Sequence, residues 1–309
     1  EVLRGPQGTL YGAGAMGGVV RNIPAVPNLE KLEGELQVGV SSTADEGSQN
    51  SVMKGVLNIP LIENSLAMRV VAYQFDESGW YKNMAASDPE TSAAATTFSA
   101  LAVDRSDVGS NEFTGGRVSI LWQPTNELTI NASYLNQKIE QDGFGQADLD
   151  LTGEWSQKRF EVRRDETVNS GFDSEFLEDD IEITNLTIEY DLAWASLLSS
   201  TSWTDEETKR INDISAFFAP SFFPWSQRVR HSGSVFSEEL RLVSELNGSF
   251  QFLIGLYYED KETGFDNIGL FGGSDASLNS FSPGNILLVK NSADRSLTQR
   301  ALFGEFYYD

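Results

Sequence analysis

The sequence contains no cysteine and a single histidine, His231. Without cysteine the chain can form neither a disulfide framework nor a thiolate metal site, and one histidine cannot build a histidine-rich metal centre. No apolar run approaches the roughly 20 residues that a membrane-spanning helix requires. We therefore expect no metal site, no cofactor and no transmembrane helix. A membrane β-barrel remains compatible with this composition, because a barrel distributes its apolar residues by alternation.

Positive charge is also scarce. Lys and Arg number 22 against 46 Asp and Glu, which gives a net charge of −24. Such a surface repels phosphate backbones, so we exclude nucleic acid as a partner. The chain is 40% hydrophobic and 11% aromatic, which is too rich for a disordered protein. It begins with Glu1 and ends within a strand-like stretch, and we interpret it as part of a longer protein.

From residue 34 onward, apolar and polar residues alternate with the period of two that is typical of β-strands. The stretch 128–133 is an example, in which Leu128, Ile130 and Ala132 alternate with Thr129 and Asn131. Nine stretches show this pattern, and residues 297–308 form a tenth by composition, although their facing is ambiguous. The sequence therefore predicts an all-β fold of about ten antiparallel strands.

The connections between these strands fall into two length classes. Short turns rich in Pro, Asn, Asp or Gly join alternate pairs, for example around Pro124 and Gly248. The other connections are long and span residues 77–111, 137–178, 206–231 and 261–296. Short turns at one end and long loops at the other are typical of outer-membrane barrels.

Two further observations favour a membrane barrel over a soluble sandwich or propeller. The polar faces carry charged residues at mid-strand, which suits a water-filled interior better than a packed core; these are Lys54, Arg69, Arg117, Glu239 and Arg241. Aromatic residues gather at both strand ends, as in the two interfacial girdles of such barrels. They are Trp122, Tyr190, Trp194 and Phe250 near the short turns, and Tyr134, Trp203 and Tyr258 toward the long loops.

A glycine motif near the N-terminus resembles a dinucleotide-binding fingerprint. Gly12, Gly14 and Gly17 have the spacing G-x-G-x-x-G. That fingerprint requires a helix to begin at the glycines, but Pro24 and Pro27 follow too closely for one. We therefore exclude nucleotide binding.

The same region resembles the end of the plug domain of TonB-dependent receptors. Residues 1–12 read Glu-Val-Leu-Arg-Gly-Pro-Gln-Gly-Thr-Leu-Tyr-Gly, and a glycine-rich segment then ends in Gly-Gly-Val-Val at residues 17–20. The following Val-Arg-Asn-Ile-Pro stands where Asn-Ile and a longer basic stretch are usual in the family. Barrel hairpins of the family are similar to residues 57–70 and 237–257, and residues 301–304 resemble the strand that follows.

This resemblance implies a transmembrane antiparallel β-barrel of 22 strands with a plug inside. Residues 1–28 are then the C-terminal end of the plug domain, and residues 29–309 are the N-terminal part of the barrel. The TonB box, most of the plug and about twelve strands lie outside this sequence.

The resemblance also implies function. Receptors of this family lie in the outer membrane of Gram-negative bacteria, and they are importers, not enzymes. They take up a scarce ligand with energy transduced by TonB, and the ligand is a ferric siderophore or other iron chelate, cobalamin or a glycan. The expected partners are TonB, outer-membrane lipid and lipopolysaccharide, and the small-molecule ligand. Two alternatives remain: a passive porin or structural barrel, which would have no plug motif, and a soluble carbohydrate-binding or hydrolytic β-domain.

Family members commonly pair plug arginines with inward barrel glutamates. By this resemblance Arg4 would contact Glu239, with Arg241 beside it on the same face, in a charge-assisted contact that can be held and released. The alternative is that Arg4 is solvated and Glu239 pairs with Arg241 or with a neighbouring strand.

The long connection 206–231 supplies candidate ligand-binding residues. Its aromatic side chains could stack on a sugar, a catechol or a macrocycle, and its arginines could meet anionic oxygens. These residues are Phe217, Phe218, Phe222, Phe223, Trp225, Arg228 and Arg230. Alternatively, the loop packs on itself or on lipopolysaccharide.

No other motif predicts catalysis or a metal site. Asp148 and Asp150 open like a calcium loop, but Arg159 stands where the bidentate acid should be, which excludes an EF-hand. Loose binding of a divalent cation by Asp148, Asp150 and Glu154 stays open. We expect His231 to be a solvated residue at a strand end.

Overall fold

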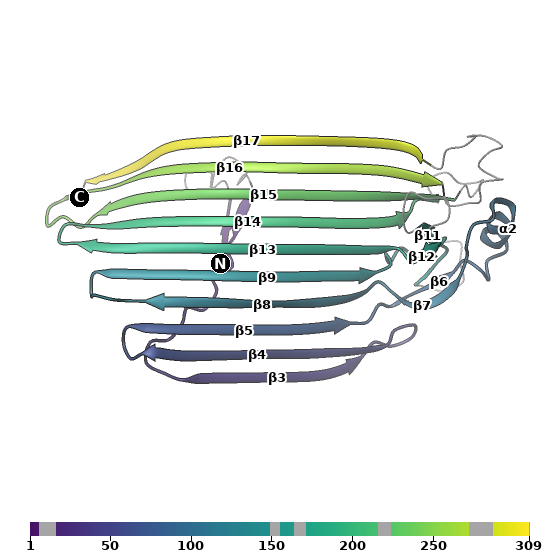
Figure 1. Cartoon of the computed structure of the whole chain (residues 1–309), viewed down its shortest axis with the longest axis horizontal. Coiled ribbons are helices and arrows are strands. Elements are labelled where there is room, and N and C mark those ends of the chain that lie inside the picture. The colour runs from purple at the N-terminus through teal and green to yellow at the C-terminus, as the bar shows by residue number, and fades with distance from the viewer. Residues whose placement is uncertain (6–16, 149–154, 164–170, 216–223, 272–286, 309) are drawn as a thin grey trace.

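The computed structural model describes residues 1–5, 17–148, 155–163, 171–215, 224–271 and 287–308. Ten antiparallel strands form one large sheet, and sheet neighbours follow one another in the chain (Figure 1). They are β3 (Glu33–Ser42), β4 (Gln49–Ile62), β5 (Leu66–Glu77), β8 (Ser110–Trp122), β9 (Leu128–Asp142), β13 (Phe176–Leu192), β14 (Ala195–Asp213), β15 (Trp225–Ser244), β16 (Phe250–Phe271) and β17 (Leu287–Tyr308). The predicted ten-stranded part of a barrel is confirmed.

The two faces of this sheet can be told apart by what touches them. An Arg117 guanidinium nitrogen donates to the carbonyl of Ala25 at 3.4 Å, and Asn58 bonds to the backbone of Asn28 and Lys31. We call the face that carries Asn58 and Arg117, and thus holds residues 25–31, the inner face. The opposite side is the outer face.

Strand register confirms the predicted alternation. Ile130 of β9 lies opposite Trp122 of β8 and Ile188 of β13, so apolar side chains meet across strands on the outer face. Ser119, in register with Arg69 and Ser133, lies on the inner face two residues from Arg117. The facing of the tenth strand, ambiguous in sequence, is settled because Leu302 lies opposite Leu256.

Several long connections are shorter than the sequence predicted, because the strands on both sides extend further. β14 continues to Asp213 and β15 begins at Trp225, so their connection is residues 214–224 and not 206–231. Likewise, β16 and β17 are joined by residues 272–286. The reason is that the outer face becomes charged beyond Trp203, where Asp205 and Glu207 follow. The hydrophobic alternation stops there although backbone pairing continues.

Smaller elements gather at the long-loop end of the sheet (Figure 1). β6 (Tyr81–Met84), β7 (Asp104–Val108) and β10 (Ser156–Gln157) form a three-stranded sheet, and β11 (Val162–Arg163) pairs with β12 (Phe172–Asp173). Helix α2 (Pro89–Phe98) was not predicted. Its first turn is capped by Asp88, whose carboxylate accepts from the Thr91 amide at 2.8 Å. None of the described helices is long and apolar enough to cross a membrane.

The N-terminal segment forms a small hairpin. β1 (Val2–Arg4) pairs with β2 (Gly18–Val20). Gly18 has φ 139°, and a Cβ atom there would lie 2.5 Å from the Leu3 carbonyl oxygen, so only glycine fits. A strand, and not a helix, follows the last glycines, which agrees with the exclusion of a nucleotide site; Gly12 and Gly14 lie outside the described residues.

Candidate functional site along the inner face and its rim

The junction between the N-terminal segment and the sheet is held by one buried side chain, Asn58 of β4. Its Oδ1 accepts from the Asn28 amide at 2.8 Å, and its Nδ2 donates to the carbonyls of Asn28 at 2.9 Å and Lys31 at 2.7 Å. The side chain is fully buried. The Asn28 side chain in turn accepts from the Glu30 amide at 2.9 Å. Residues 28–31 are therefore fixed to the inner face.

The predicted contact residues Glu239 and Arg241 lie two positions apart on the inner face of β15. They form an ion pair with each other, and the Arg241 guanidinium also lies over the ring of Phe303, 5.8 Å from its centroid. Arg4 lies in β1, opposite Gly18. Glu239 thus has the neighbouring partner that the alternative interpretation named, and its contact with Arg4 stays a prediction.

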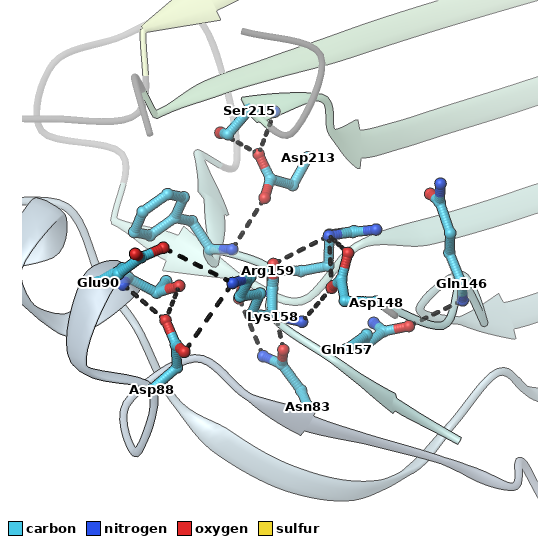
Figure 2. Close-up of polar contacts among 12 residues, drawn as sticks. Asn83, Asp88, Glu90, Gln146, Asp148, Gln157, Lys158, Arg159, Asp213 and Ser215 are labelled. Carbon is cyan, nitrogen blue, oxygen red and sulfur yellow. Dashed lines mark hydrogen bonds and ion pairs between the residues drawn. The ribbon is translucent and has the colours of Figure 1, made fainter. Parts of the chain in front are cut away.

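At the rim, a buried polar cluster joins three long connections (Figure 2). Asn83 of β6 is its centre: its Nδ2 donates to the carbonyls of Val103 and Arg159, each at 2.9 Å, and its Oδ1 accepts from the Arg159 amide at 2.7 Å. Asn83 is buried, so all its side-chain hydrogen bonds are made within the protein. These hydrogen bonds join the segment around Arg159 to the three-stranded sheet.

Charged side chains are buried on both sides of Asn83. Arg159 forms an ion pair with Asp148 at 3.1 Å, and Lys158 lies 3.9 Å from Asp88 and 4.0 Å from Glu90 (Figure 2). Arg159 occupies the position at which a calcium loop would carry its bidentate acid, and its charge neutralises Asp148, the first acid of that loop. Asp150 and Glu154 lie outside the described residues.

Two buried carboxylates, Glu175 and Asp213, connect the cluster to the end of the long strand β14. Asp213 accepts from the Phe160 amide at 3.0 Å and from the Ser215 amide at 2.9 Å. Glu175 accepts from the Asp213 amide at 2.6 Å. Burial, followed by the nearby charge of Asp213, raises the pKa of Glu175 to about 8. Glu175 is therefore largely protonated at neutral pH.

The predicted loop residues are distributed differently from the expectation. Phe217, Phe218, Phe222 and Phe223 lie outside the described residues. Trp225 is the first residue of β15, and Arg228 and Arg230 lie within that strand. Arg228 is opposite Ile211 and Arg230 is opposite Lys209, which places both arginines on the outer face. Arg230 also lies 3.8 Å from Glu207.

His231 and the described acidic side chains are the remaining candidates for a metal site. His231 is a strand residue opposite Thr208. In the part of the chain that the structure describes, no group of three or more His, Asp or Glu residues is placed to hold a metal ion.

Sequence comparisons found no matching family model and no matching curated protein. Solved structures do match. The ferric yersiniabactin uptake receptor FyuA from Yersinia pestis aligns with 99% of this chain at a TM-score of 0.74 and 14% identity. The ferric citrate transporter FecA in its unliganded form aligns with 100% at 0.65 and 11% identity. The siderophore receptor PiuA from Acinetobacter baumannii aligns with 99% at 0.62 and 14% identity.

The chain spans 40% of the length of FyuA and of FecA, and 44% of PiuA. These neighbours are TonB-dependent receptors of the Gram-negative outer membrane, the family whose plug and barrel motifs the sequence resembles. At such low identity the likeness establishes architecture, and the ten-stranded sheet with a segment fixed to its inner face agrees with it. The chain therefore has the fold of the TonB-dependent outer-membrane receptors.

Proposed function

We propose that the chain is part of an outer-membrane receptor that imports a scarce ligand with energy transduced by TonB. The observation that carries this proposal is the segment fixed to the inner face by Asn58. A passive porin or structural barrel has no need of a segment anchored inside it, whereas a gated importer does. Residues 1–28 would be the end of the plug, and residues 29–309 the first part of the barrel.

The outer face supports placement in a membrane. Large apolar side chains on it are exposed, for example Leu36, Val38 and Val40 of β3 at 75%, 69% and 85%. An apolar surface of this kind is a liability in water and is favourable in lipid. The aromatic residues predicted to form girdles are exposed as well, among them Trp122, Tyr190, Trp194, Tyr134 and Trp203.

An iron chelate is the ligand that we test first. The structural neighbours FyuA, FecA and PiuA are an uptake receptor for ferric yersiniabactin, a transporter of ferric citrate and a siderophore receptor. Cobalamin and glycans remain the other candidates. The ligand would be held at the long-loop end by the predicted aromatic residues, of which the structure describes Trp225 at the start of β15, while the outer-face position of Arg228 and Arg230 suits contact with lipopolysaccharide.

The experiment is growth and uptake in the native bacterium with the gene for the full-length protein deleted, with tonB deleted, or with neither. Ferric citrate, ferric siderophores, cobalamin and glycans are supplied singly at limiting concentration. The proposal predicts that one ligand class requires both genes. Uptake that depends on the receptor but not on TonB would instead support the passive porin.

A further inference from the structure

We propose that the inner wall formed by β4, β5 and β8 conducts an anionic passenger, so that the imported ligand carries net negative charge. The wall bears three cations, Lys54, Arg69 and Arg117, which we call the cation ladder. This inference rests on the proposed import function and adds the charge class of its ligand.

The ladder follows from strand register. Arg69 belongs to β5, Arg117 of β8 lies opposite Val71, and Lys54 of β4 lies opposite Tyr73. The cations therefore stand at the levels of residues 69, 71 and 73 of β5, which are successive inner-face levels. Such levels are about 7 Å apart along a strand. An anion can thus pass from one cation to the next without crossing a long uncharged gap.

Within the described part of the chain, the ladder cations have no carboxylate counter-ion. No ion pair joins any of the three to a carboxylate among the residues that the structure describes. On the β9 side, the inner-face residues opposite β8 at these levels are Ser133, Leu135 and Gln137, which are uncharged. On the other side, Glu33 and Glu35 of β3 lie opposite Asn58 and Val56, and neither is ion-paired to the ladder.

The position of the ladder links it to gating. Arg117 touches the Ala25 carbonyl at 3.4 Å, and Arg69 lies opposite Asn58, which holds residues 28–31. The ladder therefore lines the wall beside the point where the plug segment joins the barrel. Among the described carboxylates of residues 1–31, Glu1 pairs with Arg21 at 2.9 Å, and Glu30 forms no ion pair with the ladder.

The chemistry of the ladder fits an anion with oxygen donors. In a confined lumen, unpaired cations focus the field and raise the local concentration of anions. An arginine guanidinium presents a planar fork of donors that matches carboxylate oxygens. We infer a passenger that carries carboxylates or other anionic oxygens, although the chain as a whole has a net charge of −24.

A direct test uses KCl and needs no identified ligand. The full-length receptor is reconstituted in a planar bilayer, the plug is unfolded with urea, and the reversal potential is measured in a KCl gradient. We expect the triple variant Lys54→Gln, Arg69→Gln, Arg117→Gln to shift the potential toward cation selectivity. The control Lys138→Gln removes a charge from the outer face, where Lys138 pairs with Glu140 at 2.6 Å, and should not shift it.

A triple variant that shifts the potential no more than Lys138→Gln would overturn the inference. If the triple variant does not fold, the single variants Arg69→Gln and Arg117→Gln should each give a smaller shift of the same sign. Absence of a shift in both would overturn the inference equally.

The second measurement is uptake of the ligand that the growth experiment identifies. We expect that ligand to be an anion, and the triple variant to import it about tenfold more slowly, the low end of the effect of charge-lined clefts, while binding at the cell surface is unchanged. A neutral or cationic ligand, or unchanged uptake, would overturn the inference. A bilayer shift without any TonB-dependent uptake would refute the import function while leaving the anion-selective wall established.

Discussion

Removing the Asn58 side chain should release residues 28–31 from the inner face of the sheet. Asn58→Ala deletes three hydrogen bonds at a fully buried position and leaves the Asn28 amide and the carbonyls of Asn28 and Lys31 without this partner. Each such bond contributes about 0.5–1.5 kcal/mol, so the local opening free energy should fall by about 2–4 kcal/mol. Since 1.4 kcal/mol corresponds to a factor of ten, amide exchange should accelerate by about 30- to 700-fold.

Hydrogen exchange of the full-length receptor in lipid, followed by mass spectrometry of peptides covering residues 28–31, measures this effect. Asn58→Asp keeps the acceptor for the Asn28 amide but turns a carboxylate oxygen toward the carbonyls of Asn28 and Lys31, so it should also accelerate exchange relative to wild type. Peptides around Gly143, whose amide donates to the Glu175 carbonyl at 2.6 Å, are the internal control. Equal exchange of residues 28–31 in wild type and Asn58→Ala would refute the assigned anchoring role.

Three further predictions follow from the faces and the rim. Ile130→Arg should reduce folding stability in lipid vesicles by about 1 kcal/mol, because Ile130 lies opposite Trp122 of the predicted interfacial girdle and the cost falls toward the interface, whereas Asn131→Arg on the inner face should cost less, and equal costs would contradict the facing. The pKa of Glu175 is about 8 in the folded state against an ordinary value of 4.5, so the unfolded chain releases that proton first and stability of the rim should fall as pH rises from about 5 to 8. Burial also raises the pKa of Asp213, so Glu175→Gln should reduce that slope in a thermal unfolding series without abolishing it. Arg4→Ala and Glu239→Ala should each raise passive leak of a large antibiotic and impair TonB-dependent uptake, with the double variant no worse than one alone; additive effects would show that the two residues are not partners.

Hydrophobic alternation predicted the strands and their facing well, because one side of each strand must be apolar where it meets lipid. It failed beyond Trp203, where the outer face carries Asp205 and Glu207 and the local pattern no longer distinguishes a paired strand from a solvated loop. Backbone hydrogen bonds continue there without a sequence signal. Helix α2 did have a local signal, since Asp88 followed by Pro89 is a favourable helix start.

The buried cluster at the rim had no such local signal. Asn83 and Arg159 are 76 residues apart, and Phe160 and Asp213 are 53 apart. Each residue is ordinary in its own segment, and only the assembled connections bring the partners together. The same holds for Asn58, whose partners Asn28 and Lys31 are 30 and 27 residues away. Long-range polar contacts of this kind depend on strand order and register, which composition and spacing do not specify.

We expect the outer face to meet lipid while the inner face lines a polar lumen, and the other predictions depend on this facing. This chain has no cysteine, so once any cysteine in the rest of the full-length receptor is replaced by serine, single cysteines at positions 128–133 can each carry one spin label. Accessibility to oxygen and to a water-soluble nickel chelate is then measured in lipid vesicles. We predict high oxygen accessibility at 128, 130 and 132, and low values at 129, 131 and 133. An absent period of two, or the opposite phase, would contradict the account.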